Sequence, residues 1–406
     1  MSNSGIYKQN FINIDQDAII DESIENSYFE TRDAVKNSYY PQIQAVFDDR
    51  TISDIKNISQ KIKKFKNVLV IGVGGSSLGG KTFTSLGNSN KIDFLESIDP
   101  VTVAKKIAKI DPSNCFFLIV SKSGETIETI SQTLVILNYL KKLEIKNIAD
   151  NFLFVTQDHE NSLAKIAKSI DAEIFAHPSD VGGRFSCFTV VGLLPAIIAG
   201  VDIDAIIKGA RSAVENFIEN EQNEVLIATK LQDLLFDEGF TGNVIMPYID
   251  DMKNYTDWYR QLWAESLGKE GFGSVPINSM GTVDQHSQLQ LYLEGPRDKF
   301  FTFFTANTHK TDLLVVDLPE VKTLFGGKKL SEIVKIESDT TIKVLQDKEL
   351  PIRVFEIEEF NEEVLGALMM HMFLEVILLA KIRNIDPFDQ PGVEIRKNIA
   401  KDLLRK

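Results

Sequence analysis

Residues 67–80 read Asn-Val-Leu-Val-Ile-Gly-Val-Gly-Gly-Ser-Ser-Leu-Gly-Gly, and the rest of the chain can be interpreted from them. Residues 68–71 are a β-branched and aliphatic run, which is typical of a buried strand in a parallel sheet. A glycine-rich loop containing Gly75 and Ser76 follows, and residues 81–86 can begin a helix. Such a loop can hold a phosphate, because its N–H groups and the helix N-terminus face an anion. A plain tight turn is the alternative, since the spacing matches no established phosphate motif.

Apolar strand-like segments alternate with helical segments from this stretch onward. Alternation of this kind predicts an α/β fold with a parallel sheet and helices on both faces. Right-handed crossovers then place every strand-to-helix loop at one edge of the sheet, where ligands bind. The expected strands of this unit are residues 68–71, 91–94, 115–120, 151–155 and 173–175.

A second alternating unit begins near residue 241, with expected strands at 243–248, 300–304, 313–317, 342–345 and 353–357. The predicted organisation is therefore two α/β units with helical extensions at both ends. Its parts are an N-terminal helical arm (1–50), a first unit with the phosphate-binding loops (51–200), a helical connector (201–240), a second unit (241–385) and a C-terminal helix (386–406).

Composition excludes several classes of function. The net charge of −14 argues against a nucleic-acid surface and against contact with an anionic membrane, so an anionic ligand needs local positive groups. Cys115 and Cys187 lie in apolar stretches and are expected to be buried thiols, with no disulfide framework and no metal site. No signal peptide is expected, which predicts the reducing cytoplasm. The apolar run 364–380 is interrupted by His371 and Glu375 and is expected to be a buried helix.

A second loop with the same chemistry follows the expected strand 115–120. It supplies Ser121, Lys122, Ser123 and Thr126 at the start of a helix. Hydroxyls and helix N–H groups suit a phosphate monoester, and the lysine adds positive charge. The alternative is an ordinary capped helix start. Two such loops at one sheet edge favour a phosphate cradle.

Four further segments carry candidate side chains. Arg184 lies between a glycine pair and an apolar helix, where it either bridges two elements or faces an oxyanion. Gln261 and Glu265 are four residues apart and share a helix face, and a carboxylate in a last helical turn is disfavoured by the helix dipole. His286 follows a glycine turn, and Lys397 follows the turn at 390–392. A surface glutamate, a structural histidine and a snorkelling lysine are the alternatives.

Two motifs carry a resemblance to a known family. Gly-Gly-Arg-Phe-Ser at 182–186 and Asp-Gln-x-Gly-Val-Glu-x-x-Lys at 389–397 resemble those of the glucose-6-phosphate isomerases, in a compact bacterial form. The resemblance extends from about residue 72 to the C-terminus. It implies two sugar-isomerase (SIS) domains, reversible interconversion of D-glucose 6-phosphate and D-fructose 6-phosphate in glycolysis and gluconeogenesis, no cofactor and a homodimer. A dual glucose/mannose 6-phosphate isomerase and a non-catalytic phosphosugar-binding protein are the alternatives.

The resemblance also implies roles for individual residues. Glu265 is the implied base that carries a proton between C2 and C1, and Arg184 is the implied stabiliser of the enediolate. His286, supplied by the neighbouring subunit, and Lys397 are implied in opening the pyranose ring. The implied substrate-binding residues are Gly75, Ser76, Ser121, Lys122, Ser123 and Thr126 for the phosphate, and Gln261 and Gln390 for sugar hydroxyls.

Overall fold

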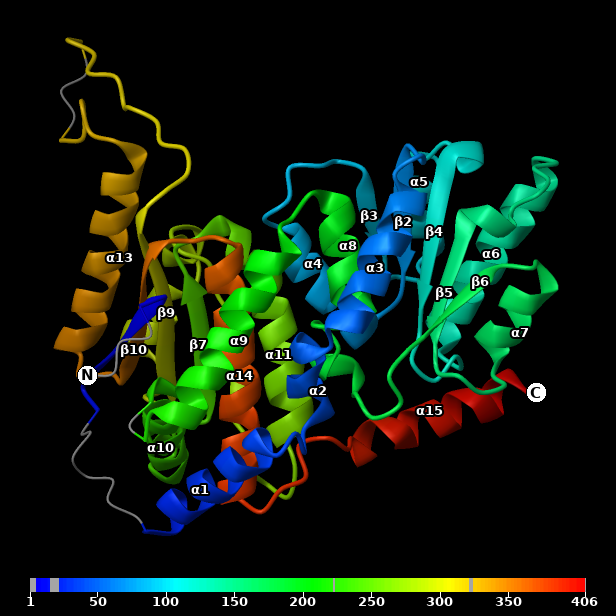
Figure 1. Cartoon of the computed structure of the whole chain (residues 1–406). Helices are drawn as coiled ribbons and strands as arrows, with labels where there is room; N and C mark the ends of the chain where they lie inside the picture. Colours follow the sequence, from blue (N-terminus) through cyan, green and yellow to red (C-terminus); the bar gives the residue numbers. More distant parts are fainter. Residues whose placement is uncertain (1–4, 15–21, 222, 321–323, 406) are drawn as a thin grey trace.

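A computed structural model of the chain describes residues 5–14, 22–221, 223–320 and 324–405. Two α/β units lie side by side, each built on a five-stranded sheet (Figure 1). The predicted α/β fold with two sheet-based units is confirmed.

The sheet of the first unit is entirely parallel, with strand order β3-β2-β4-β5-β6. Each expected strand is present with its bounds shifted by two residues at most. The strands are β2 (Asn67–Ile71), β3 (Ile92–Leu95), β4 (Cys115–Val120), β5 (Phe152–Thr156) and β6 (Glu173–Ala176).

Successive residues of these strands pack alternately into two hydrophobic cores, one on each face of the sheet. Val70 and Leu118 pack toward α3 and α8, whereas Leu69 and Ile119 pack toward α5, α6 and α7. Side chains point to opposite faces with a period of two, so a strand buried on both faces must be apolar throughout. The helices are α3 (Asp49–Ile62), α4 (Leu78–Thr84), α5 (Pro100–Ile107), α6 (Ile127–Lys142), α7 (Ser162–Ser169) and α8 (Val190–Ala199).

The strand order places the two polar loops next to each other. The chain moves from β2 outward to β3 on one side, and then returns to β4 on the other side of β2. The loops after β2 and β4 therefore flank the point where the strand order reverses, which is where ligands bind in open α/β sheets.

The sheet of the second unit has the order β1-β10-β9-β7-β8, and all pairs except β1–β10 are parallel. Strand β1 corrects the prediction that residues 1–50 form a purely helical arm. Two helices of the predicted arm follow it, α1 (Glu22–Lys36) and α2 (Pro41–Gln44). The strands are β1 (Tyr7–Ile12), β7 (Gly242–Pro247), β8 (Val275–Asn278), β9 (Lys299–Thr308) and β10 (Ile352–Glu359).

Two expected strands of this unit are wrong. Residues 342–345 lie inside helix α13 (Leu330–Asp347), where Thr341 and Leu345 are buried at helical spacing. Within 313–317 the described pairing is a single bridge, Leu314 to Lys329. Strand β8 was not expected, because it is a short edge strand that contains Pro276.

Helix α14 (Glu362–Ile382) forms the centre of the molecule. It is apolar and long enough to cross a membrane, but 94% of its most apolar window is buried inside the protein, as the sequence predicts. It packs against α9 (Ile203–Glu219), α10 (Glu224–Asp237) and α11 (Lys253–Leu267), so the residues expected to form a connector cover this central helix (Figure 1). The remaining helices are α12 (Leu289–Glu294) and α15 (Pro391–Leu404), of which α15 runs along the outside of the first unit.

Candidate active site

The glycine loop after β2 forms the turn η2 (Gly74–Ser76) and touches a second turn, η5 (Gly183–Phe185). A Cβ atom added to Gly75 would lie 2.2 Å from the carbonyl carbon of Gly183, so only glycine permits this contact. The hydroxyl of Ser186 lies 2.7 Å from the Gly183 carbonyl oxygen and 3.2 Å from that of Gly75, so it can donate to either turn. The glycine loop thereby fixes the turn that carries Arg184.

The second polar loop joins β4 to α6. Ser121 is buried, and its hydroxyl lies 2.9 Å from that of Thr126, just before the N-terminus of α6. Gly124 adopts φ +65°, which a residue with a side chain rarely does. Lys122 is half-buried: burial lowers the pKa of its ammonium group, and the carboxylate of Asp180 opposes that shift. The loop thus offers hydroxyls, a helix N-terminus and one cation at the sheet edge.

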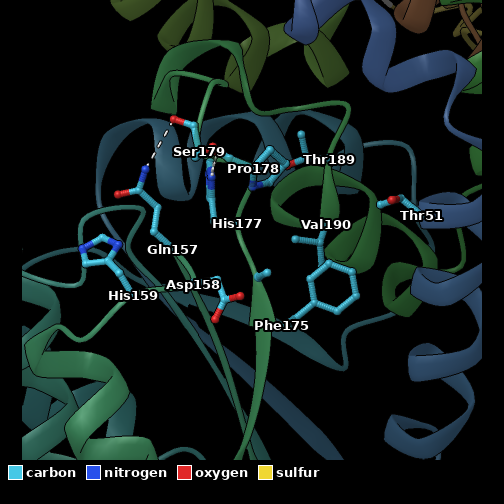
Figure 2. Close-up of a pocket in the computed structure, with 11 residues that line it drawn as sticks. Thr51, Gln157, Asp158, His159, Phe175, His177, Pro178, Ser179, Thr189 and Val190 are labelled. Carbon is cyan, nitrogen blue, oxygen red and sulfur yellow. Dashed lines mark hydrogen bonds between the residues drawn. The ribbon is translucent and has the colours of Figure 1, made fainter.

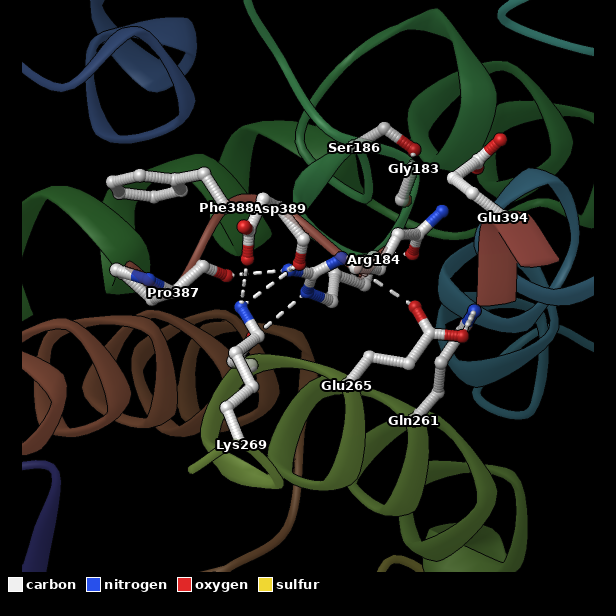
Figure 3. Close-up of polar contacts among 12 residues, drawn as sticks. Gly183, Arg184, Ser186, Gln261, Glu265, Lys269, Pro387, Phe388, Asp389 and Glu394 are labelled. Carbon is white, nitrogen blue, oxygen red and sulfur yellow. Dashed lines mark hydrogen bonds and ion pairs between the residues drawn. The ribbon is translucent and has the colours of Figure 1, made fainter. Parts of the chain in front are cut away.

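Arg184 is buried, with 4% of its surface exposed, and contacts two segments that are distant in the chain (Figure 3). All of its hydrogen-bond groups are directed at protein acceptors. Nε donates to Ser266 Oγ at 2.8 Å, Nη1 lies 3.1 Å from Gln390 Oε1 and 3.5 Å from Glu265 Oε2, and Nη2 donates to the carbonyls of Pro387 and of Asp389, the latter at 2.8 Å.

Glu265 lies in the last turn of α11, with 26% of its side chain exposed. One carboxylate oxygen faces Arg184, and the other accepts a hydrogen bond from Gln261 Nε2 at 3.1 Å (Figure 3). A Cβ atom on Gly74 would lie 2.9 Å from Gln261 Nε2, so Gln261 joins α11 to the glycine loop. Within the described part of the chain, Gln261 Oε1 is buried without a hydrogen-bond partner and can accept a ligand hydroxyl.

The guanidinium of Arg184 is surrounded by carboxylates. Burial lowers the pKa of the Arg184 guanidinium, while the carboxylates of Glu265, Asp389 and Asp386 raise it. Arginine nonetheless stays charged in proteins, because its pKa lies far above neutral pH. The site therefore contains a fixed buried cation beside a partly exposed carboxylate.

The structure brings some of the predicted site residues together and leaves others apart. Arg184, Gln261, Glu265 and Gln390 form one cluster, and Gly75 contacts it. Ser76, Ser121, Lys122, Ser123 and Thr126 lie on the two loops that flank the strand-order reversal.

His286 and Lys397 do not reach the cluster within this chain. His286 is exposed at the end of the turn η7 (Val283–His286). Lys397 pairs with Glu394 Oε1 at 2.6 Å on α15. Among the described residues, no hydrogen bond or ion pair joins either side chain to Arg184 or Glu265.

Sequence reasoning missed several groups of this cluster. Ser266 follows Glu265 directly and Lys269 comes three residues later, but nothing in their pattern distinguishes them from surface residues of a helix end. The backbone carbonyls of Pro387 and Asp389 accept from Arg184, and a carbonyl has no signal in a sequence. The sequence could suggest these two carbonyls only because they lie in and just before the Asp-Gln-x-Gly motif.

A separate cavity of about 390 Å³ lies behind the second polar loop (Figure 2). Gln157, which lines it, donates its backbone N–H to the Lys122 carbonyl at 3.0 Å. His177 also lines it and is 3% exposed, and burial lowers the pKa of its imidazole to about 4. None of the residues of the Arg184 cluster lines this cavity. Among the described residues, no three His, Cys, Asp or Glu side chains are grouped to hold a metal ion.

Comparison with known proteins agrees with this geometry. Residues 34–406 match the sequence profile of the family described as phosphoglucose isomerase. The chain belongs to the phosphoglucose isomerase family. It is 34% identical over 384 residues to the glucose-6-phosphate isomerase of Carboxydothermus hydrogenoformans, covering 88% of this chain and 82% of that protein. It is also 34% identical over 358 residues to the probable glucose-6-phosphate isomerase of Methanococcus maripaludis, covering 86% and 80%.

Solved structures show the same fold for this phosphoglucose isomerase family member. A hypothetical protein from Thermus thermophilus superposes with a TM-score of 0.90 at 26% identity, over 98% of this chain and all of the other. A glucose-6-phosphate isomerase from Chlamydia trachomatis superposes with a TM-score of 0.78 at 21% identity, over 89% and 74% of the two chains. The family resemblance inferred from the motifs at 182–186 and 389–397 is confirmed.

Proposed function

We propose that this chain interconverts D-glucose 6-phosphate and D-fructose 6-phosphate through ring opening and a cis-enediolate, as a step of glycolysis and gluconeogenesis. The names of its relatives support this activity. The observation that carries the proposal is the contact between Arg184 and Glu265, 3.5 Å apart, at a turn fixed to the glycine loop.

Substrate binding is proposed to begin at the phosphate. Ser121, Lys122, Ser123 and Thr126 with the N-terminus of α6, and Ser76 on the neighbouring loop, hold the 6-phosphate. This anchor directs the sugar carbons toward α11, where Gln261 and Gln390 accept and donate to hydroxyls. The buried, unpartnered Oε1 of Gln261 supports that role.

Proton transfer is proposed to follow on the open-chain sugar. The carboxylate of Glu265 takes the C2 proton of the aldose, the C2–H electron pair forms the C1–C2 double bond, and the C1 carbonyl oxygen becomes an oxyanion. Once Glu265 is protonated, Arg184 Nη1, which faces Glu265 in the free protein, donates to that oxyanion and stabilises it. Glu265 then returns the proton to C1, while the O2 proton passes to O1, so that O2 becomes the ketone oxygen and O1 a hydroxyl. A single carboxylate therefore serves as both base and acid.

Ring opening needs groups that move protons on the ring oxygen and the anomeric hydroxyl. We assign this step to Lys397, on the helix that follows Gln390, and to His286 of the partner subunit, since His286 is exposed and, among the described residues of its own chain, has no hydrogen bond or ion pair with the cluster. The working unit is then a homodimer. The cytoplasmic location stays a prediction, as does the absence of nucleic-acid and membrane partners.

The activity is tested by converting fructose 6-phosphate to glucose 6-phosphate with a coupled dehydrogenase, in the presence of a chelator. Wild-type turnover with loss of at least about 10³-fold in Glu265→Gln is expected, because the base is removed. Glu270→Gln is the matched control, since Glu270 is an exposed carboxylate one turn away. No turnover by the wild-type chain, or near-normal turnover by Glu265→Gln, would refute the proposal.

Turnover of mannose 6-phosphate distinguishes the proposed function from a dual glucose/mannose 6-phosphate isomerase. A dual isomerase forms fructose 6-phosphate from it at a rate comparable to that from glucose 6-phosphate. A non-catalytic phosphosugar-binding protein retains either ligand without turnover. The clustering of Glu265 with Arg184 and Gln261 argues against the second alternative, because binding alone needs no such base.

A further inference from the structure

Lys269 has an unusual environment for a lysine that follows a helix end. It comes directly after Gly268, where α11 terminates, and 12% of its side chain is exposed. Its ammonium group donates to the backbone carbonyls of Asp386 and Asp389, the latter at 2.9 Å, and lies 2.5 Å from Asp389 Oδ1. An ammonium group has three protons, and these three acceptors use all of them.

Arg184 contacts the same loop, residues 386–390 (Figure 3). Arg184 Nη2 donates to the Pro387 and Asp389 carbonyls, so the Asp389 carbonyl accepts from both cations. The loop lies between α14 and α15 and has no regular secondary structure of its own. These two side chains hold its backbone carbonyls, and Phe388 packs against the rings of Tyr40 and Phe185.

The position of Arg184 Nη1 depends on this loop. Nη2 is fixed by two carbonyls and Nε by Ser266, which leaves Nη1 directed at Glu265 and Gln390. The guanidinium is planar, so anchoring Nη2 fixes the direction in which Nη1 donates. Gln390 belongs to the same loop and moves with it.

We propose that Lys269 is a positioning residue of the isomerase: it holds the carbonyls of residues 386 and 389 so that Arg184 Nη1 and Gln390 face the reacting carbons. The inference rests on the proposed function. Lys269 acts through Arg184. It is therefore needed for stabilisation of the oxyanion but not for binding of the phosphate. It contacts none of the residues of the two polar loops.

The test compares Lys269→Met, which keeps the length of the side chain and removes its donors, with wild type. We expect kcat for fructose 6-phosphate to fall about 10- to 100-fold, because misplacing one oxyanion donor has an effect of this order. The affinity for 5-phospho-D-arabinonate, whose carboxylate resembles the enediolate, falls by a similar factor. The inhibition constant of inorganic phosphate changes less than about threefold. Lys348→Met, which removes a surface ion pair to Glu294, is the matched control.

A double-mutant cycle separates positioning from a structural role. In an Arg184→Met background, Lys269→Met should lower kcat by less than about twofold further, because the group it positions is gone. Lys269→Arg should recover most of the activity, since it can donate to the same carbonyls. If Lys269→Met is not recovered folded, Lys269→Gln takes its place in the cycle.

Three results would overturn the inference. The first is a Lys269→Met variant with the kcat and the inhibitor affinity of wild type, and the second is a variant that loses affinity for inorganic phosphate and for the enediolate analogue by the same factor. The third is a double variant whose loss in kcat equals the product of the losses in the two single variants. Absence of turnover in the wild-type chain would instead refute the proposed function, so the two failures are distinguishable.

Discussion

Replacing Gly75 by alanine tests whether the glycine loop and the Arg184 turn form one unit. The added Cβ would lie 2.2 Å from the Gly183 carbonyl carbon, 2.4 Å from its oxygen and 2.6 Å from the Arg184 nitrogen, all of them backbone atoms. An ordinary contact begins at 3.4 Å, so the two turns must separate by about 1.2 Å.

Moving the two turns apart would increase the distance between the phosphate loops and Arg184. A misplacement of about 1 Å can cost about 10²-fold in rate, so we expect Gly75→Ala to lose about 10²-fold in kcat/KM. The forced contact should also lower the free energy of unfolding by about 1–3 kcal/mol. Both are measured on the same sample, by the coupled assay with fructose 6-phosphate and by urea unfolding.

Gly182→Ala is the matched control. Gly182 has φ −66°, and the nearest atom to an added Cβ is Phe185 Cδ2 at 3.8 Å, an ordinary contact. Activity within a few-fold of wild type is expected for this variant. If Gly75→Ala retains more than about a third of wild-type kcat/KM, or if both variants lose activity equally, the two turns are not coupled in this way.

Three other predictions concern separate parts of the molecule. Lys122→Met should raise the KM for fructose 6-phosphate about tenfold with little change in kcat, because it removes a uniform phosphate contact; unchanged KM would contradict its role. Burial lowers the pKa of His177 from 6.5 to about 4, so the unfolded chain binds the proton first and the free energy of unfolding falls by about 3 kcal/mol as pH decreases from 6.5 to 4. Urea unfolding of His177→Gln should show a smaller decrease, whereas His159→Gln, at an exposed position, should match wild type. Glu375→Gln should cost about 3–5 kcal/mol at pH 7, because it leaves the guanidinium of Arg353 buried and unpaired, and a loss below about 1 kcal/mol would count against this ion pair.

Much of the fold could be predicted from local patterns. The strands β2 and β4 are buried on both faces, so their continuous apolar runs are distinctive, and each is followed by a polar loop. Strand β1 could not be found in this way, because Tyr7–Ile12 is a polar edge strand paired to β10 across more than 340 residues. Residues 342–345 were misassigned because a β-branched apolar patch on a half-exposed helix resembles a short strand.

In the candidate site, too, only residues with a local sequence signal could be predicted. Arg184 and Glu265 are charged residues beside glycine turns, and Gln390 belongs to a recognisable motif. Ser266 and Lys269 could not, because their importance arises from contacts with Arg184 and with residues 386–389, which lie far away in the chain. A contact of that kind depends on tertiary packing and leaves no local pattern.

The measurement closest to the central claim follows deuterium from D₂O into the sugar during catalysis. Wild-type enzyme should place deuterium at C2 of glucose 6-phosphate and at C1 of fructose 6-phosphate on prolonged incubation, as read by NMR, because a carboxylate that carries the proton can exchange it with solvent. Glu265→Gln should show neither turnover nor incorporation. Turnover or deuterium incorporation by Glu265→Gln at the wild-type rate would contradict proton transfer by Glu265.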